Sequence, residues 1–150
     1  MKKFLIIISI LVSFTHLHAN ENGLVVKQTE KSVQEVIETS KMVLESKGFT
    51  IFAVVDHSAG AKSAGLMLEE EQLIIFGNPK GGTLLMSENA NIGLDLPMKI
   101  LVYSDTLGKT KVVYNDPLYL ETRYSILKSS KIITKMQGLF TMLSSKVEAL

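Results

Sequence analysis

Residues 76–99 (FGNPKGGTLLMSENANIGLDLPMK) constrain the fold of this 150-residue chain more than any other stretch. They hold two of the three prolines and four of the ten glycines. Because proline and glycine interrupt helices and strands, this stretch cannot form one continuous element. We expect a loop, a short helix over residues 83–87 and a second loop, which together join two strands.

Two segments have the periodicity of amphipathic helices. Apolar residues recur every three or four positions over residues 33–44, and again over residues 132–147, which places them on one helical face. Ser32 and Glu35 have the spacing of a capping box before the first segment, and Gly48 follows it as the expected stop. Asp116-Pro117 predicts the start of a shorter helix over residues 118–127, and the last helix is expected over residues 130–149.

Five short runs have the composition of β-strands: residues 23–27, 49–55, 73–76, 98–103 and 110–114. The last two flank a turn-forming link and predict a β-hairpin. Residues 49–55 are almost wholly apolar, which favours a central strand or one covered on both faces. The small residues at 58–66 indicate a short helix that packs closely. The chain therefore predicts one α+β domain over residues 20–150, with a mainly antiparallel sheet of four to five strands, two long helices and short connecting helices.

The first 19 residues have the three parts of a signal peptide: Lys2 and Lys3, an apolar run over residues 4–14, and Leu17-His18-Ala19 as cleavage signal. The apolar run is shorter than the roughly 20 residues that span a bilayer. This favours cleavage after Ala19 over the alternative, an uncleaved membrane anchor. We expect a periplasmic or secreted protein with no stable membrane span after cleavage.

Composition argues against several classes of function. The chain has no cysteine, which excludes disulfides, thiol catalysis and zinc–thiolate sites. Without the leader, 14 basic residues face 15 acidic ones, and this near-neutral balance argues against nucleic acid as a partner. His57 is the only histidine after residue 19, and the methionines are dispersed as core residues would be. We expect no metal site and no cofactor.

Several spaced motifs resemble one known family. These are Phe76-Gly77-Asn78-Pro79, Gly82-Thr83-x-x-Met86, the run from Ile92 to Pro97 (IGLDLP), Tyr114-Asn115-Asp116-Pro117, and Asp56-His57. Together they are similar to the bacterial and archaeal family called domain of unknown function 302, over residues 24–148. This chain has Tyr124 where many members of that family have a histidine. The resemblance implies a compact α+β domain able to form a homodimer, and it implies no known reaction.

The glycines of residues 77–82 invite comparison with a phosphate-binding loop. A Walker A loop needs Lys-Ser or Lys-Thr directly after its second glycine, whereas Gly82 is followed by Thr83-Leu84. A weaker alternative is an anion cradle made by the backbone N–H groups of residues 81–83 with Lys80. The competing interpretation is that the glycines only permit tight turns. The candidate ligand-binding residues of this stretch are Asn78, Lys80, Gly82, Thr83 and Met86.

His57 and Asp95 are the candidates for proton transfer, which requires them to lie within hydrogen-bond reach or one water apart. Asp56, His57 and Ser58 are consecutive and so cannot converge as a catalytic triad. The alternative is that His57 has a structural role at a strand end. Asp95 lies between leucines, where a carboxylate must be hydrogen-bonded or turned to solvent. We favour hydrogen bonds from Asp95 to backbone amides of residues 89–93.

These observations support three hypotheses. The first is a non-catalytic module that binds a small anionic or apolar ligand near residues 78–86, with His57 and Asp95 also lining the pocket. The second is a hydrolase-like or isomerase-like enzyme that uses His57 and Asp95 for proton transfer. The third is a structural or partner-binding domain without a ligand site, which could form a homodimer through the last helix or a sheet edge.

Overall fold

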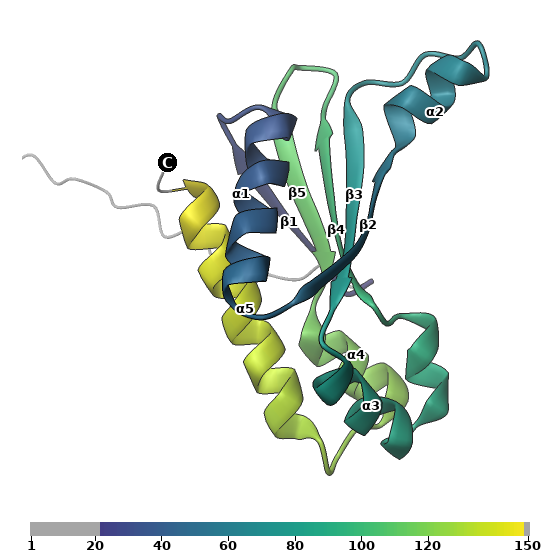
Figure 1. The fold of residues 1–150 in the computed structure, drawn as a ribbon, viewed down its shortest axis with the longest axis vertical. Helices are drawn as coiled ribbons and strands as arrows, with labels where there is room; N and C mark the ends of the chain where they lie inside the picture. The colour runs from purple at the N-terminus through teal and green to yellow at the C-terminus, as the bar shows by residue number, and fades with distance from the viewer. Residues whose placement is uncertain (1–21, 149–150) are drawn as a thin grey trace, which may run out of the picture.

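The computed structural model describes residues 22–148 (Figure 1). The signal peptide predicted over residues 1–19 lies outside the described residues. In chain order the elements are β1 (Leu24–Thr29), α1 (Val33–Ser46), β2 (Thr50–Asp56), α2 (His57–Ser63), β3 (Glu71–Gly77), α3 (Pro79–Glu88), the 3₁₀ helix η1 (Ala90–Leu94), β4 (Met98–Ser104), β5 (Thr110–Asn115), α4 (Pro117–Tyr124) and α5 (Ser130–Glu148).

The five strands form one antiparallel sheet in the order β1-β5-β4-β3-β2. In the centre of the sheet, Ile74 faces Ile100 and Phe76 faces Met98. These four side chains point to the same face, since alternate residues of a strand share a face. The prediction of one α+β domain with a mainly antiparallel sheet is confirmed.

Helices α1 and α5 lie side by side over one face of the sheet (Figure 1). The predicted capping box is present, because Ser32 Oγ accepts from the N–H of Glu35 and the Glu35 side chain accepts from the N–H of Ser32. The apolar stripes of the two helices bury against the strands, and Phe140 of α5 stacks on Tyr114 of β5 with ring centroids 4.1 Å apart. The first turns of α5 extend beyond the end of the sheet and lie beside α4 (Figure 1).

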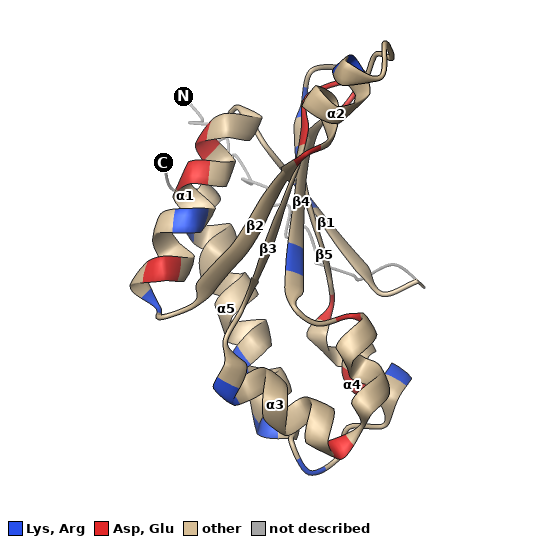
Figure 2. Ribbon diagram, turned by 45° about the vertical axis from the view of Figure 1, so that its right-hand side comes forward, with Lys and Arg blue, Asp and Glu red and all other residues tan. Residues whose placement is uncertain are grey.

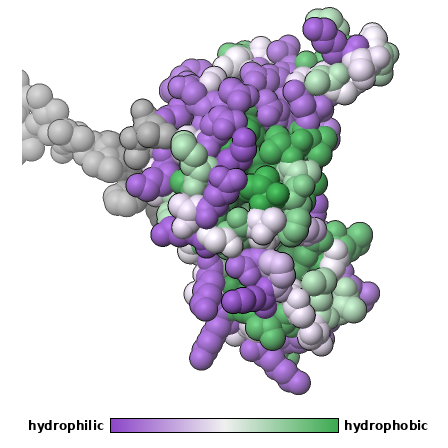
Figure 3. Space-filling view, viewed as in Figure 1, coloured by the Kyte–Doolittle hydropathy of each residue, from purple (hydrophilic) through white to green (hydrophobic). Residues whose placement is uncertain are grey.

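Strand β2 differs from its prediction. It lies at the edge of the sheet, although its apolar composition predicted a central or doubly covered strand. A bulge between Ile51 and Ala53 breaks its register with β3, and Phe52 is 53% exposed. Hydrophobic surface accordingly gathers where Figure 1 shows β2 (Figure 3). Composition alone therefore did not reveal the position of this strand, because strand order depends on the whole topology.

Helix α2 also differs, since none of its residues is buried and it projects from one end of the sheet (Figure 2). Its small residues do not mark close packing. At the opposite end, α3 is longer than the predicted helix over residues 83–87. It begins at Pro79 because the Asn78 side chain caps it and proline is tolerated in the first turn, where no N–H partner is needed.

Candidate functional site

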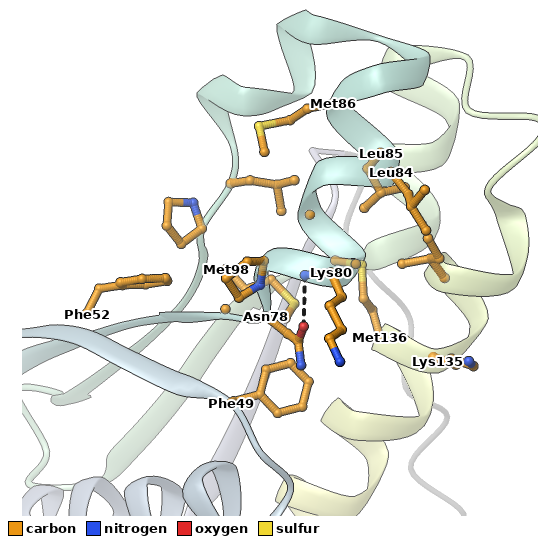
Figure 4. A pocket seen from close by; sticks show the side chains of 17 residues that line it. Phe49, Phe52, Asn78, Lys80, Leu84, Leu85, Met86, Met98, Lys135 and Met136 are labelled. Carbon is orange, nitrogen blue, oxygen red and sulfur yellow. Dashed lines mark hydrogen bonds between the residues drawn. The ribbon is translucent and has the colours of Figure 1, made fainter.

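A cleft of about 460 Å³ opens where β2 begins and β3 ends, against α3 and α5 (Figure 4). Its walls come from segments far apart in the sequence: the start of β2, the first two turns of α3, the turn before β4 and the first two turns of α5. Most of the lining is apolar. The residues are Phe49, Phe52, Gly77, Asn78, Pro79, Lys80, Gly81, Gly82, Leu84, Leu85, Met86, Leu96, Pro97, Met98, Ile132, Lys135 and Met136.

Asn78 caps the N-terminus of α3, the helix that forms one wall of the cleft. Its Oδ1 accepts from the N–H of Lys80 at 3.0 Å, and its Nδ2 donates to the carbonyl of Gly48 at 3.4 Å. The N–H groups of Gly81 and Gly82 both donate to the Asn78 carbonyl, at 3.1 and 3.0 Å. The suggested backbone anion cradle is therefore wrong, because these two N–H groups are already used within the first turn of α3.

The two glycines of α3 are not required by packing. A Cβ added at Gly81 would lie 3.7 Å from Ile132 Cγ2, and one added at Gly82 would lie 3.9 Å from Met86 Cε. Both are ordinary van der Waals distances, and the first shows that α3 lies beside α5 at Gly81. Leu85 is the one residue of α3 that is buried, and it anchors the helix to the core with 1% of its surface exposed.

The other side chains of α3 that line the cleft are large and exposed. Leu84 is 58% exposed and Met86 is 40% exposed. The two point to opposite sides of α3, and Phe52 of β2 lies on the Met86 side (Figure 4). Soluble domains rarely leave several large apolar side chains together in a concave surface without a ligand or partner. The cleft can therefore bury additional apolar surface.

Charge in the cleft has one sign. Among the lining residues that the structure describes, Lys80 and Lys135 are the only charged ones, and no Asp or Glu lines it. Both lysines are exposed, and no ion pair or hydrogen bond of either ammonium group occurs within the described part of the chain. Figure 4 shows them near Met136, whereas Met86 lies toward the opposite end of α3. An acidic group could thus bind at this end without displacing another carboxylate.

Glu88 holds the two helical walls in place. Its carboxylate accepts from the backbone N–H groups of Leu127, Lys128 and Ser129 at 2.6, 2.8 and 2.9 Å, just before α5 begins. These bonds, with that from Lys128 the largest contribution, lower the pKa of Glu88 below its ordinary value. The end of α3 therefore caps the start of α5 from about 40 residues away.

His57 lies far from this cleft. It begins α2 directly after β2, whose first residue Thr50 pairs with Gly77 beside the cleft. Six strand residues at about 3.3 Å each separate the two places by about 20 Å. Asp56 before it caps α2, since its Oδ1 accepts from the N–H of Ala59 at 2.8 Å. The expectation that His57 lines the same pocket as residues 78–86 is wrong in this structure.

Asp95 has partners other than those expected. Its Oδ2 accepts from the Tyr124 hydroxyl at 2.6 Å and lies 3.4 Å from Arg123 Nη1, instead of bonding amides of residues 89–93. The hydrogen bond to Asp95 raises the pKa of Tyr124 above its ordinary value. Asp95 precedes β4 at the cleft end of the sheet, whereas His57 is at the other end. The proposed His57–Asp95 proton-transfer pair is therefore not formed.

Of the seven residues predicted from the sequence, the structure brings Asn78, Lys80, Gly82 and Met86 to the cleft. The exposed Thr83 lies outside its lining, and so do the half-buried His57 and Asp95. Sequence reasoning missed Phe52, Leu84 and Lys135. Lys135 follows Ile132 by three residues on α5, so helical spacing placed the two near each other, but no sequence signal placed them opposite α3.

The described part of the chain has neither a cluster of metal-binding side chains nor a helix that could span a membrane. Residues 22–148 contain no group of three or more His, Cys, Asp or Glu side chains that could hold a metal ion. None of their helices is both long enough and apolar enough to cross a membrane.

Comparison with known proteins relates the chain to one family. The family model described as "Domain of unknown function DUF302" matches residues 25–144. Among curated proteins, "Fluoride-specific ion channel FluC 1" of Brucella suis biovar 1 (strain 1330) is 45% identical over 115 residues, covering 77% of this chain and 45% of that protein. The protein of the same name from Brucella abortus biovar 1 (strain 9-941) is also 45% identical over 115 residues, covering 77% of this chain and 43% of that protein. The chain thus spans less than half the length of these curated relatives.

A solved structure shares the fold. It is the "Crystal structure of uncharacterized conserved protein DUF302 from Bacillus stearothermophilus", with a TM-score of 0.74 at 19% sequence identity. The match covers 84% of this chain and 98% of that one. At this identity the likeness concerns the fold alone.

Proposed function

The chain belongs to the DUF302 family, and from that premise we propose that it is a non-catalytic module that binds a small ligand in the cleft between α3 and α5. One observation carries the proposal: a cleft of about 460 Å³ whose lining includes exposed Phe52, Leu84 and Met86. This volume lies within the roughly 300–1,000 Å³ of typical small-molecule sites. No general acid or base with a partner faces the cleft among the described residues, which favours binding over catalysis.

Ligand screening tests this proposal. Native mass spectrometry and thermal shift on the chain without its leader would be run against a panel of small apolar and amphipathic molecules. We expect a one-to-one complex that raises the melting temperature and is weakened by Leu84→Gln. The matched control is Leu118→Gln, which changes an exposed leucine of α4 outside the cleft. Absence of any complex, or equal weakening by both variants, would count against the cleft as a binding site.

We further propose that the module works outside the cytoplasm, in the periplasm or as a secreted protein. The support is the signal-peptide pattern of residues 1–19. N-terminal sequencing of protein from the periplasmic fraction should begin at Asn20. A full-length chain retained in the cytoplasm or the membrane would reject this location.

The Brucella relatives favour a second candidate function, a domain that acts beside a membrane transport protein. The support is 45% identity over 115 residues to proteins that carry the name of a fluoride-specific channel. If this is its role, deleting the gene should increase the sensitivity of the cell to fluoride, and the wild-type chain should restore growth. Unchanged sensitivity would argue against it. Light scattering would test in parallel whether the domain forms the homodimer proposed for it.

A further inference from the structure

The charged and apolar parts of the cleft are separated along α3. Lys80 lies in the first turn of this helix, and Leu84 lies four residues later on the same side, which is about 6 Å along the helix axis at about 1.5 Å per residue. Lys135 joins Lys80 at the α5 side of the cleft (Figure 4). A ligand that lies along α3 would therefore meet positive charge at one end and hydrophobic side chains over the rest of its length.

The apolar part of the cleft contains three methionines, of which Met86 is exposed and Met98 and Met136 are buried. Methionine is unbranched and has several rotatable bonds, so its side chain accommodates ligands of varied shape. A flexible chain suits such a wall better than a rigid ring that needs one fixed outline. Leu84 adds exposed apolar surface for it to cover.

The charged end of the cleft is positive, and no carboxylate lines the cleft within the described part of the chain. The ion pairs among the described residues involve neither Lys80 nor Lys135. An anion bound near these two ammonium groups would be attracted by both, whereas a cation there would be repelled. Lysine acts on carboxylates and phosphates as a point charge, so the lysines select the sign of the ligand head more than its shape.

We propose that the ligand of this cleft is a single-chain organic anion, with its acidic head at Lys80 and Lys135 and its flexible apolar tail along Leu84 and Ile132. This inference rests on the proposed function, since it names the class of molecule that the same cleft binds. A fatty-acid-like carboxylate and an alkyl phosphate share this chemistry. The cleft supplies no group that distinguishes them, so the experiment compares both.

The first measurement varies the probe. Isothermal titration calorimetry with the wild-type chain would use dodecanoate, dodecyl phosphate, dodecanol, dodecyltrimethylammonium and acetate, each below its micelle-forming concentration. We expect one site for dodecanoate or dodecyl phosphate, affinity at least tenfold lower for the alcohol and the cation, and no measurable binding of acetate. The affinity for the anion should fall as salt is added, because exposed charges are screened.

The second measurement varies the protein. The double variant Lys80→Met and Lys135→Met removes both charges and keeps apolar stems of similar length. It should weaken the alkyl anion about tenfold, which corresponds to about 1.4 kcal/mol, and leave dodecanol unchanged. Lys131→Met is the matched control, since Lys131 is an exposed residue of the same helix outside the cleft, and we expect no change.

The outcomes separate the two proposals. Equal affinity for dodecanoate, dodecanol and the cation, with weakening by Leu84→Gln, would refute an anionic ligand and retain an apolar binding site. Binding that is unchanged in the double lysine variant would refute the assigned head position. If none of the alkyl probes binds, the inference of a single-chain anion is wrong, and the wider ligand screen then decides the proposed function by itself.

Discussion

Two adjacent leucines of α3 should separate stability from binding. Leu85 is the buried anchor of the helix, with 1% of its surface exposed, whereas Leu84 is 58% exposed and faces the cleft. Replacing Leu85 by alanine removes three buried carbon groups, each worth about 0.8 kcal/mol of transfer free energy, and leaves a cavity behind. We expect Leu85→Ala to lower the free energy of unfolding by about 3 kcal/mol. Leu84→Ala should change it by less than about 0.5 kcal/mol, as is typical of an exposed site.

Urea denaturation followed by circular dichroism measures both values on the chain without its leader. For a domain of this size, a loss of about 3 kcal/mol also lowers the melting temperature by roughly 10 °C. In the calorimetric assay, Leu84→Ala should weaken the ligand while the fold stays intact. The reasoning would be refuted if Leu84→Ala cost as much stability as Leu85→Ala, because α3 would then present a different face to the core.

Three further predictions concern contacts outside the cleft surface. Glu88→Gln should destabilise the protein at neutral pH, because the lowered pKa of Glu88 means that its carboxylate form is favoured by folding. This contribution to the free energy of unfolding is present above the ordinary pKa of glutamate, about 4.3. It is lost as the pH falls through the lower pKa that Glu88 has in the folded protein. The stabilities of the wild type and the variant should therefore converge in acid. The phenol of Tyr124 should ionise above the usual range in an absorbance titration, and Asp95→Asn should lower its pKa, since the bond to Asp95 is the main cause of the shift. Gly23→Ala should cost more than about 2 kcal/mol, because the φ of +77° is strained for alanine and the added Cβ would lie 2.2 Å from Tyr119 Cγ.

Each of the three has a matched control. Glu45→Gln removes a carboxylate from the exposed face of α1 and should change the free energy of unfolding at neutral pH by less than about 0.5 kcal/mol. The difference between the titrations of wild type and Tyr124→Phe isolates this phenol from the other tyrosines. Gly48→Ala has a similar φ of +75° with nothing within 4 Å of the added Cβ, so it should cost only the backbone strain of about 1 kcal/mol. Equal losses at Gly23 and Gly48 would show that the contact with Tyr119 is unimportant.

Local patterns in the sequence predicted most of the secondary structure. The capping box of Ser32 and Glu35, the apolar stripes of α1 and α5, and the β4–β5 hairpin were all expected, and all are present. The family was also identified from spaced motifs, and its model matches residues 25–144. These features were accessible because each depends on interactions between residues that are close in sequence, or on a pattern of residue types alone.

The tertiary structure decided the candidate site. The sequence pointed to residues 78–86 as the place to look, and four of the five candidates there line the cleft. It could not indicate that Lys135 lines the same cleft as α3, that Glu88 caps α5, or that Asp95 binds Tyr124. It also grouped His57 with Asp95, although the length of β2 separates them. These contacts depend on strand order and on the angle at which α5 passes the sheet, and such long-range geometry follows from the packing of the whole domain, which no local pattern specifies.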